Sequence, residues 1–360
     1  MWPVADSVPL RVPAPGLTLA AMRPLVSVVM PVRNAAATLP AALQSLRVQT
    51  LPGVELLALD HASTDRTPEI LEVMKCTYAH MRISAFQQEM GFAEVLNRGI
   101  AMAEGALIAR MDADDVCHPE RLRMQAARLQ GEPELGVVAS RVAFGGDAVA
   151  QAGYARHVEW SNGLLSHEDL ALARFRESPL AHPSVMFRRE LADRHGGYRD
   201  GPFPEDYELW LRWFDAGVRF GKLPETLLTW NDPPQRLSRT HPRYAPDAFY
   251  AVKADYLARW LARNNPHHPD VVVVGAGRVT RRRVEKLLEN GVRVKAWADL
   301  DPGKIGRVYH GAPVIRHDDL PPPGAAFVVP FVSSTGAADY IRALLESRGF
   351  VRGRDFIEAA

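Results

Sequence analysis

Residues 106–115 read Ala-Leu-Ile-Ala-Arg-Met-Asp-Ala-Asp-Asp, a short apolar run that ends in three carboxylates. An apolar run of this length between Gly105 and Pro119 is typical of a buried strand. Two earlier runs have the same character, Val26-Ser-Val-Val-Met-Pro31 and Glu55-Leu-Leu-Ala-Leu-Asp60. The sequence therefore predicts three buried strands, two of which end in acidic residues.

Amphipathic helical patterns lie between these strands. Apolar residues recur at helical spacing at Leu39, Leu43 and Leu46, and again at Phe92, Val95, Leu96 and Ile100. The alternation of strands and helices predicts an α/β fold in which a parallel sheet is built with right-handed crossovers. Ligands of such sheets bind at the carboxyl ends of the strands, where Asp60 and the cluster at 112–115 are expected.

The length of 360 residues favours two domains. A polar, proline-bearing stretch, Asn264-Asn-Pro-His-His-Pro269, marks the expected boundary. Beyond it, Val271-Val-Val-Val-Gly-Ala-Gly277 predicts a strand that enters a glycine turn, and further helix and strand patterns follow. We therefore predict a flexible leader over residues 1–24, a main domain over 25–264, and a small Rossmann-like βαβ domain over 265–360.

Composition excludes several classes of protein. Lys and Arg number 43 against 42 Asp and Glu, so the usual electrostatic argument for nucleic acid binding is missing. Cys76 and Cys117 are too few for a disulfide scaffold, and both are predicted to be buried thiols. No apolar run approaches the roughly 20 residues of a membrane helix. The chain is predicted to be cytoplasmic; a peripheral position at the inner face of a membrane and the oligomeric state stay open.

The cluster Asp112-Ala-Asp-Asp115 carries the clearest chemical signal. Carboxylates crowded at a strand end repel one another unless a cation neutralises them, and oxygen ligands suit Mg²⁺ or Mn²⁺. The alternative is a solvated acidic turn, the commoner meaning of such a short motif taken alone.

A series of short blocks, spread over about residues 25 to 240, carries a family resemblance. The blocks are Ser27-Val-Val-Met-Pro-Val-Arg-Asn34, Gln49-Thr50, Leu59-Asp-His-Ala-Ser-Thr-Asp65, Arg110-Met-Asp-Ala-Asp-Asp115, Pro119-Glu-Arg-Leu122, Ala181-His-Pro-Ser-Val-Met186, Gly196-Gly-Tyr198, Glu205-Asp-Tyr-Glu-Leu-Trp210 and Arg236-Leu-Ser238. In this order they resemble glycosyltransferase family 2. The resemblance implies a GT-A fold and inverting transfer of a sugar from a nucleoside-diphosphate donor, with a UDP-sugar favoured. It further implies a glycan or lipid-linked acceptor, a divalent metal ion (Mn²⁺ or Mg²⁺) as cofactor, and a place in polysaccharide biosynthesis of the cell envelope.

The resemblance also implies roles for single residues. Asp114 resembles the metal-binding aspartate, and Asp112 resembles the acid that reaches the ribose or the metal. Asp206 resembles the general base, which direct displacement needs because the acceptor hydroxyl must lose its proton; the alternative is that Asp206 only caps its helix. His182 occurs where the family often has a histidine near the catalytic centre, with a structural role as the alternative. Trp210 is either an acceptor wall or a core residue.

The residues expected to contact the donor are Pro31, Arg33, Asn34, Asp60, His61, Asp112 and Arg236. His61 departs from the family pattern, in which a second aspartate often pairs with the uracil imide, so uridine specificity is less secure here. Arg33 replaces a frequent aromatic residue. Arg236 could fold over the pyrophosphate because guanidinium groups suit phosphates, although solvated arginines are common on surfaces.

The C-terminal stretch Gly275-Ala-Gly-Arg-Val-Thr280 is a weak dinucleotide fingerprint, because Thr280 replaces the third glycine. Asp299 or Asp301 follows about 20 residues later, where an acid could bind a ribose. Asp301-Pro-Gly-Lys-Ile-Gly306 and Gly311-Ala-Pro-Val314 resemble the nucleotide-sugar-binding, Rossmann-like domain of sugar acyltransferases. Packing without a ligand is an equal alternative. Two other functions stay open for the chain: a nucleotide-sugar sensor without catalysis, and an NAD(P)-dependent oxidoreductase that uses this C-terminal domain.

Overall fold

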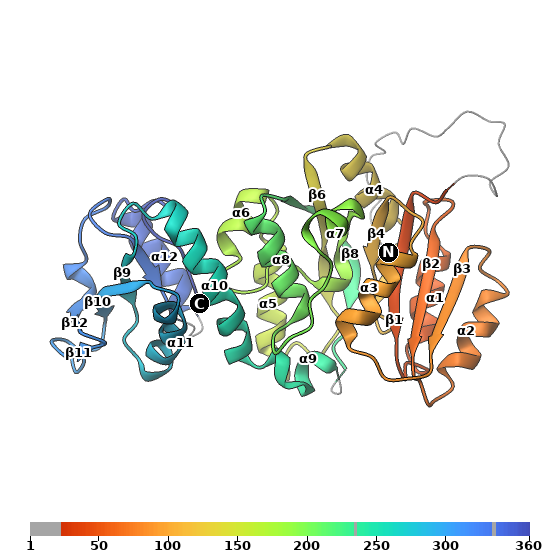
Figure 1. Ribbon diagram of the computed structural model, residues 1–360, viewed down its shortest axis with the longest axis horizontal. Coiled ribbons are helices and arrows are strands. Elements are labelled where there is room, and N and C mark those ends of the chain that lie inside the picture. The colour runs from red at the N-terminus through yellow and green to blue at the C-terminus, as the bar shows by residue number, and fades with distance from the viewer. Residues whose placement is uncertain (1–22, 234–235, 333–335) are drawn as a thin grey trace. The chain divides into compact units, whose positions relative to one another are not determined.

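Residues 23–233, 236–332 and 336–360 are described in this computed structural model (Figure 1). Contacts between residues divide them into two compact units. The first unit contains residues 23–167, 180–200 and 218–233, and the second contains residues 168–179, 201–217, 236–332 and 336–360. The domain boundaries predicted from the sequence stay a prediction.

The first unit is built on one mixed sheet, which in the described part of the chain has eight strands in the order β3-β2-β1-β4-β7-β6-β8-β5. The strands are β1 (Val26–Val32), β2 (Glu55–His61), β3 (Met81–Phe86), β4 (Leu107–Arg110), β5 (Val116–Cys117), β6 (Leu135–Phe144), β7 (Met186–Arg188) and β8 (Arg219–Trp230). Strands β3, β2, β1 and β4 run parallel, as the sequence predicts. Strand β7 runs antiparallel to both β4 and β6.

The three strands predicted from the sequence are confirmed as β1, β2 and β4. Strand β3 was not predicted, because this edge strand is half exposed and has no continuous apolar run. The helices and short 3-10 turn of the first unit are α1 (Leu39–Arg47), α2 (Thr67–Lys75), α3 (Phe92–Met102), α4 (Arg121–Gly131), α5 (Ala152–Asn162), η2 (His182–Ser184) and α7 (Glu190–His195).

Helices cover both faces of the parallel strands. On one face, Leu39, Leu43 and Leu46 of α1 share a core with Val28 and Met30 of β1, as their helical spacing predicts. On the other face lies α3, which approaches β1 and β2 at Gly99. A Cβ atom added at Gly99 would lie 2.5 Å from Val29 and 2.6 Å from Leu59, so only glycine allows this approach. Strands buried on both faces need largely apolar sequence, and β1 and β2 have it over Val28-Val-Met-Pro-Val32 and Leu56-Leu-Ala-Leu59.

The second unit contains a smaller sheet, with the strand order β11-β12-β10-β9-β13 among the described residues. Its strands are β9 (Asp270–Val274), β10 (Arg293–Asp299), β11 (Val308–Tyr309), β12 (Ala312–Arg316) and β13 (Val328–Pro330). Strands β12, β10, β9 and β13 are parallel, and β11 pairs with β12 in the antiparallel sense. The helices and 3-10 turns of this unit are α6 (His167–Ala173, all but its first residue), α8 (Glu205–Asp215), α9 (Leu237–Thr240), η3 (Pro242–Tyr244), α10 (Pro246–Asn264), α11 (Arg278–Glu289), η4 (His317–Asp319) and α12 (Ala337–Ser347).

Helices α8 and α10 share a hydrophobic core with the small sheet. Tyr207 and Leu211 of α8 belong to the same buried cluster as Leu257 and Leu261 of α10 and Val273 of β9. The residues around Asp206 are therefore held by apolar packing within the second unit. Asp206 itself lies in the first turn of α8.

The two cysteines of the chain differ in their exposure. Cys117 is buried, but the prediction that Cys76 is buried is wrong: Cys76 follows the last residue of α2 and is exposed there. Among the described residues, no helix combines the length and the apolar character that a membrane-spanning segment requires.

Candidate active site

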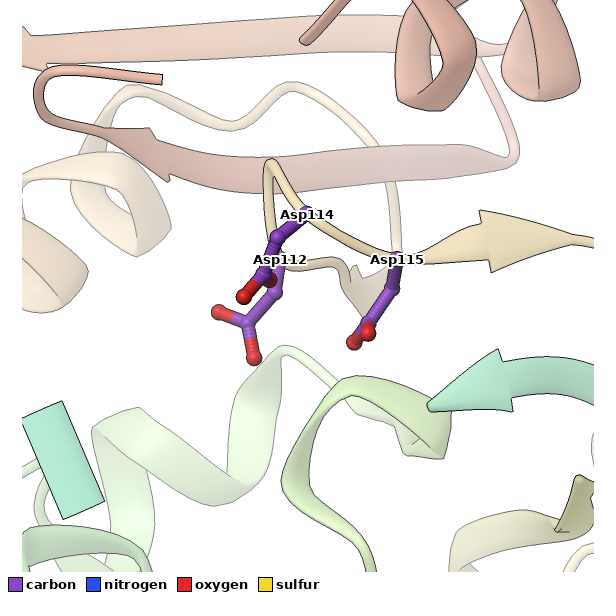
Figure 2. Close-up of side chains that lie close together, drawn as sticks. All are labelled: Asp112, Asp114 and Asp115. Carbon is purple, nitrogen blue, oxygen red and sulfur yellow. The ribbon is translucent and has the colours of Figure 1, made fainter. Parts of the chain in front are cut away.

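Three carboxylates gather where β4 ends. One ligand oxygen each from Asp112, Asp114 and Asp115 can be chosen so that all three lie within 4.8 Å of one another (Figure 2). In Figure 2 the carboxyl groups of Asp112 and Asp114 lie next to each other, and that of Asp115 lies apart from them on the right. The turn thus brings the two predicted metal ligands together with Asp115, the third acid of the predicted cluster, to which the sequence assigned no role of its own.

The acidic turn is held by the strand at the edge of the sheet. Strand β5 follows the turn and pairs with β8, so that Val116 lies opposite Thr229. Just beyond β8, the backbone N–H of Asn231 donates to Oδ1 of Asp115 at 2.8 Å, and the Asn231 side chain donates to the carbonyl oxygen of Asp114 at 2.6 Å. Asn231 is a site residue that sequence reasoning missed, since nothing in its neighbourhood links it to residues more than a hundred positions earlier.

The chemistry of the cluster fits a divalent cation. Ionised carboxylates are acceptors only, so three of them at this separation need positive charge close by. Nη2 of the buried Arg110 lies 2.5 Å from Oδ1 of Asp112 and brings one positive charge to the cluster. A hard cation prefers oxygen ligands of this kind, and Asp112 and Asp114, which are partly exposed, are placed to hold it.

Four of the residues predicted to contact the donor gather at the carboxyl ends of β1 and β2. These strands are neighbours in register, with Pro31 opposite Leu59 and Val32 opposite Asp60. Asn34 follows β1 in the left-handed region, with φ of 48°, and its Oδ1 accepts the backbone N–H of Thr64 at 2.8 Å. The residues brought together there are Arg33, Asn34, Asp60 and His61.

His61 is buried at the end of β2, with 7% of its surface exposed. Burial, and next the charge of Arg33, lower the pKa of His61, while Asp60 and Glu89 act in the opposite direction. Arg33 in turn forms an ion pair with Glu89, at 2.5 Å. Among the residues that the structure describes, Nδ1 of His61 has no hydrogen-bond partner. The ring is therefore neutral near pH 7 and offers one unused nitrogen.

His182 is buried in η2, and its Nε2 lies 2.7 Å from the hydroxyl of Tyr198. The two rings also pack, with centroids 5.4 Å apart. One ring nitrogen of His182 is therefore engaged by Tyr198, which lies in the same unit. The catalytic role expected for His182 stays a prediction.

Asp206 and Arg236 belong to the second unit. Oδ1 of Asp206 accepts the backbone N–H of Tyr207 at 2.7 Å, so the carboxylate faces the positive end of the α8 dipole, which favours its charged form. Arg236 lies directly before α9. Trp210, one turn beyond Asp206, is fully buried and packs edge-on against Trp213 at 5.8 Å, which agrees with its core-packing alternative.

In the glycine turn of the small sheet, the carboxylate of Asp299 already bonds to neighbouring residues. Oδ2 of Asp299 accepts the backbone N–H of Ala276 at 2.7 Å, and Nζ of Lys304 lies 3.1 Å from the same carboxylate. Although burial opposes the change, hydrogen bonds from the backbone of Asp301 and Ala276 and from Lys304 lower the pKa of Asp299. Asp299, one of the two acids expected to bind a ribose, is thus already bonded within the turn itself. Ligand binding at this turn stays a prediction.

Comparison with known proteins supports the family resemblance. The model of the family "Glycosyl transferase family 2" matches residues 27–196. EpsE of Bacillus subtilis (strain 168) is 31% identical over 210 residues, which are 57% of this chain and 72% of EpsE. The chain belongs to glycosyl transferase family 2. It is a glycosyltransferase, as the sequence predicts.

Two further comparisons agree with this assignment. The amylovoran biosynthesis glycosyltransferase AmsE of Erwinia amylovora is 27% identical over 186 residues, which are 52% of this chain and 67% of AmsE. The crystal structure of S. aureus TarS 1-349 in complex with UDP-GlcNAc has a TM-score of 0.53 at 19% identity, covering 74% of this chain and 71% of that chain. At this identity the likeness concerns the fold alone, and it confirms the predicted GT-A fold. The resemblance of the C-terminal residues to acyltransferase domains stays a prediction.

Proposed function

We propose that this glycosyltransferase moves a sugar from a nucleoside-diphosphate donor to a hydroxyl group of a glycan or lipid-linked acceptor, with inversion at the anomeric carbon. The observation that carries the proposal is the placement of two groups of residues on one sheet edge. Strand β1 lies between β2 and β4, and all three are parallel, so Asn34, Asp60 and the carboxylates at 112–115 follow strands at the same edge. A nucleotide beside Asn34 and Asp60 and a cation-bound diphosphate beside the carboxylates at 112–115 fit this edge of the sheet.

The proposed roles of the chain's residues follow from the charges in the reaction. Asp112 and Asp114 hold a divalent ion, Mn²⁺ or Mg²⁺, which when bound neutralises charge on the departing diphosphate. Asp206 accepts the proton of the acceptor hydroxyl as that oxygen attacks the anomeric carbon. One displacement on the face opposite the leaving group inverts the configuration. His182 and Arg236 are assigned to the neighbourhood of the reacting groups and of the pyrophosphate, respectively.

The relatives suggest which molecules take part. AmsE is named for amylovoran biosynthesis, and WbnJ of Escherichia coli, 27% identical over 235 residues, for O-antigen biosynthesis. A surface polysaccharide or its lipid-linked precursor is therefore the proposed acceptor, and such an acceptor requires at least a transient visit to the inner face of the membrane. TarS binds UDP-GlcNAc, and a UDP-sugar is the proposed donor here.

The proposal is tested by the melting temperature of the full chain with UDP, GDP, CDP and dTDP, each with and without Mn²⁺ or Mg²⁺. A ligand that binds only the native state stabilises it by about 2.7 kcal/mol at 100 times its Kd. We expect one nucleotide, UDP, to raise the melting temperature only when the metal is present. A shift without metal dependence would contradict the role of the acidic cluster, and no shift with any nucleotide would contradict the donor class.

A second prediction concerns His61 and the pH dependence of donor binding. A neutral imidazole can accept the imide N–H of uracil at Nδ1, whereas a protonated ring cannot. Because the pKa of His61 lies below the ordinary 6.5, this acceptor is present at neutral pH and is lost as the pH falls through the lowered value. Losing one hydrogen bond of about 1 kcal/mol corresponds to about a fivefold loss of affinity.

The measurement is the affinity for UDP between pH 7.5 and pH 5 in the wild type and in His61→Asn, whose amide does not titrate. Both proteins share the titration of the diphosphate, so the difference between them isolates His61. We expect the affinity of the wild type to fall more steeply by about fivefold. If the affinity for UDP falls equally with pH in both proteins, His61 does not form a hydrogen bond to the base.

A further inference from the structure

Glu205, the first residue of α8, is a buried acid that accepts a hydrogen bond from a tyrosine. Only 2% of its surface is exposed. The hydroxyl of Tyr244 donates to Oε2 of Glu205 at 2.7 Å, and Nη1 of Arg243 lies 3.8 Å from the same oxygen. Glu205 immediately precedes Asp206, the proposed base. Two carboxylates thus stand side by side in the first turn of one helix, and one of them is buried.

The charge on Glu205 is finely balanced. Burial, and next the charge of Asp206, raise the pKa of Glu205 to about 7. The hydrogen bond from Tyr244 and the charge of Arg243 act in the opposite direction and favour the ionised form. Burial and the neighbouring acids raise the pKa of Tyr244 as well, so that its hydroxyl keeps its proton and remains a donor. Glu205 therefore changes its charge near neutral pH, and Tyr244 shifts the balance towards the anion.

Tyr244 comes from a short turn that is held by its own hydrogen bonds. In η3, the ring of His241 accepts the backbone N–H of Arg243 at 3.3 Å, and the carbonyl oxygen of His241 accepts the backbone N–H of Tyr244 at 3.1 Å. The turn lies between α9, which follows Arg236, and α10, which begins at Pro246. The Tyr244 hydroxyl is thus presented to Glu205 from a fixed backbone.

We propose that Tyr244 is a positioning residue for the reaction: by donating to Glu205 it keeps that carboxylate charged, and the charge makes Asp206 a stronger base. The inference rests on the proposed function, in which Asp206 is the base. A negative charge on Glu205 opposes a second negative charge on Asp206, so Asp206 holds a proton more firmly when Glu205 is ionised. The two acids titrate as a coupled pair, and within the part of the chain that the structure describes the other groups that face Glu205 are Arg243 and Tyr244.

The test is the pH profile of kcat/KM and kcat in Tyr244→Phe. Without the hydroxyl, Glu205 is neutral over a wider range of pH, and Asp206 ionises more easily. We expect the acidic limb of the profile to move to lower pH by about half a unit. The plateau is expected to fall by about threefold, because a weaker base transfers the proton less well.

Two further variants show whether the effect passes through Glu205. Glu205→Gln removes the charge and keeps the shape, so it is expected to move the acidic limb in the same direction. The double variant Tyr244→Phe/Glu205→Gln is expected to match Glu205→Gln alone, since Tyr244 then has no charge to stabilise. If Tyr244→Phe does not fold, Glu205→Gln alone still tests the proposal: an unmoved acidic limb overturns it.

Tyr256→Phe is the matched control. The Tyr256 hydroxyl donates to Oε1 of Glu208 at 2.6 Å, so this variant removes a hydrogen bond of similar length between α10 and α8, away from the Glu205–Asp206 pair. We expect its melting temperature to fall and its pH profile to keep its limb. The proposal is overturned if Tyr244→Phe lowers activity equally at every pH, or if Tyr256→Phe moves the limb as far. A failure of the proposed function can be told apart from a failure of this inference: if Asp206 is not the base, Asp206→Asn remains active.

Discussion

Asp206→Asn is expected to lower turnover by about 100- to 10,000-fold while donor binding stays unchanged. The amide keeps the size of the side chain but cannot take a proton from the acceptor hydroxyl. It can still accept the backbone N–H of Tyr207, so the start of α8 is expected to keep its structure. Turnover is measured with donor and acceptor in excess, and donor binding is measured by the metal-dependent rise in melting temperature.

Asp215→Asn is the control for this variant. Asp215 lies at the other end of α8 and pairs with Arg259 and Arg263, so the same chemical change is made on the same helix. We expect lower stability and turnover within a few-fold of the wild type. Near-normal turnover in Asp206→Asn would exclude Asp206 as the base and leave it the role of a helix cap.

Asp114→Asn is expected to abolish the metal-dependent part of nucleotide binding and to lower turnover by about 100-fold or more. A divalent ion contributes several kcal/mol to stabilising the charge of the leaving group, and each 1.4 kcal/mol is a factor of ten in rate. The carbonyl oxygen of Asp114 still accepts from Asn231 in the variant, so the turn is expected to keep its shape. The measurement is turnover over a range of Mn²⁺ and Mg²⁺ concentrations.

Asp193→Asn serves as the control for the loss of one carboxylate in the first unit. Asp193 is exposed on α7, and its loss is expected to change neither metal dependence nor turnover. If Asp114→Asn keeps the metal requirement of the wild type, the acidic turn does not hold the ion, and its simpler meaning as a solvated turn is restored.

Much of the fold could be predicted because the strands of the first unit are buried on both faces. Burial of this kind demands largely apolar sequence. Val26–Val32 and Glu55–His61 are buried at every position, and each contains an apolar run, Val28-Val-Met-Pro-Val32 and Leu56-Leu-Ala-Leu59. The half-exposed edge strand Met81–Phe86 has no such pattern and was missed. The prediction that Cys76 is buried is wrong for a related reason. Whether a cysteine at the end of a helix is buried depends on which other elements pack against it.

The sequence by itself determined the family, the parallel strands and the carboxylates at 112–115, because these are encoded in short contiguous stretches. Only the tertiary structure decided which distant groups complete them. Asn231 reaches the acidic turn because β5 pairs with β8, and Tyr244 reaches Glu205 from a turn after α9. Asp299 is likewise engaged by Ala276 and Lys304, which its position at a strand end does not reveal. Such partners are far apart along the chain and meet only once the chain has folded. The patterns of strands and helices, in contrast, depend on residues that are close together in the sequence.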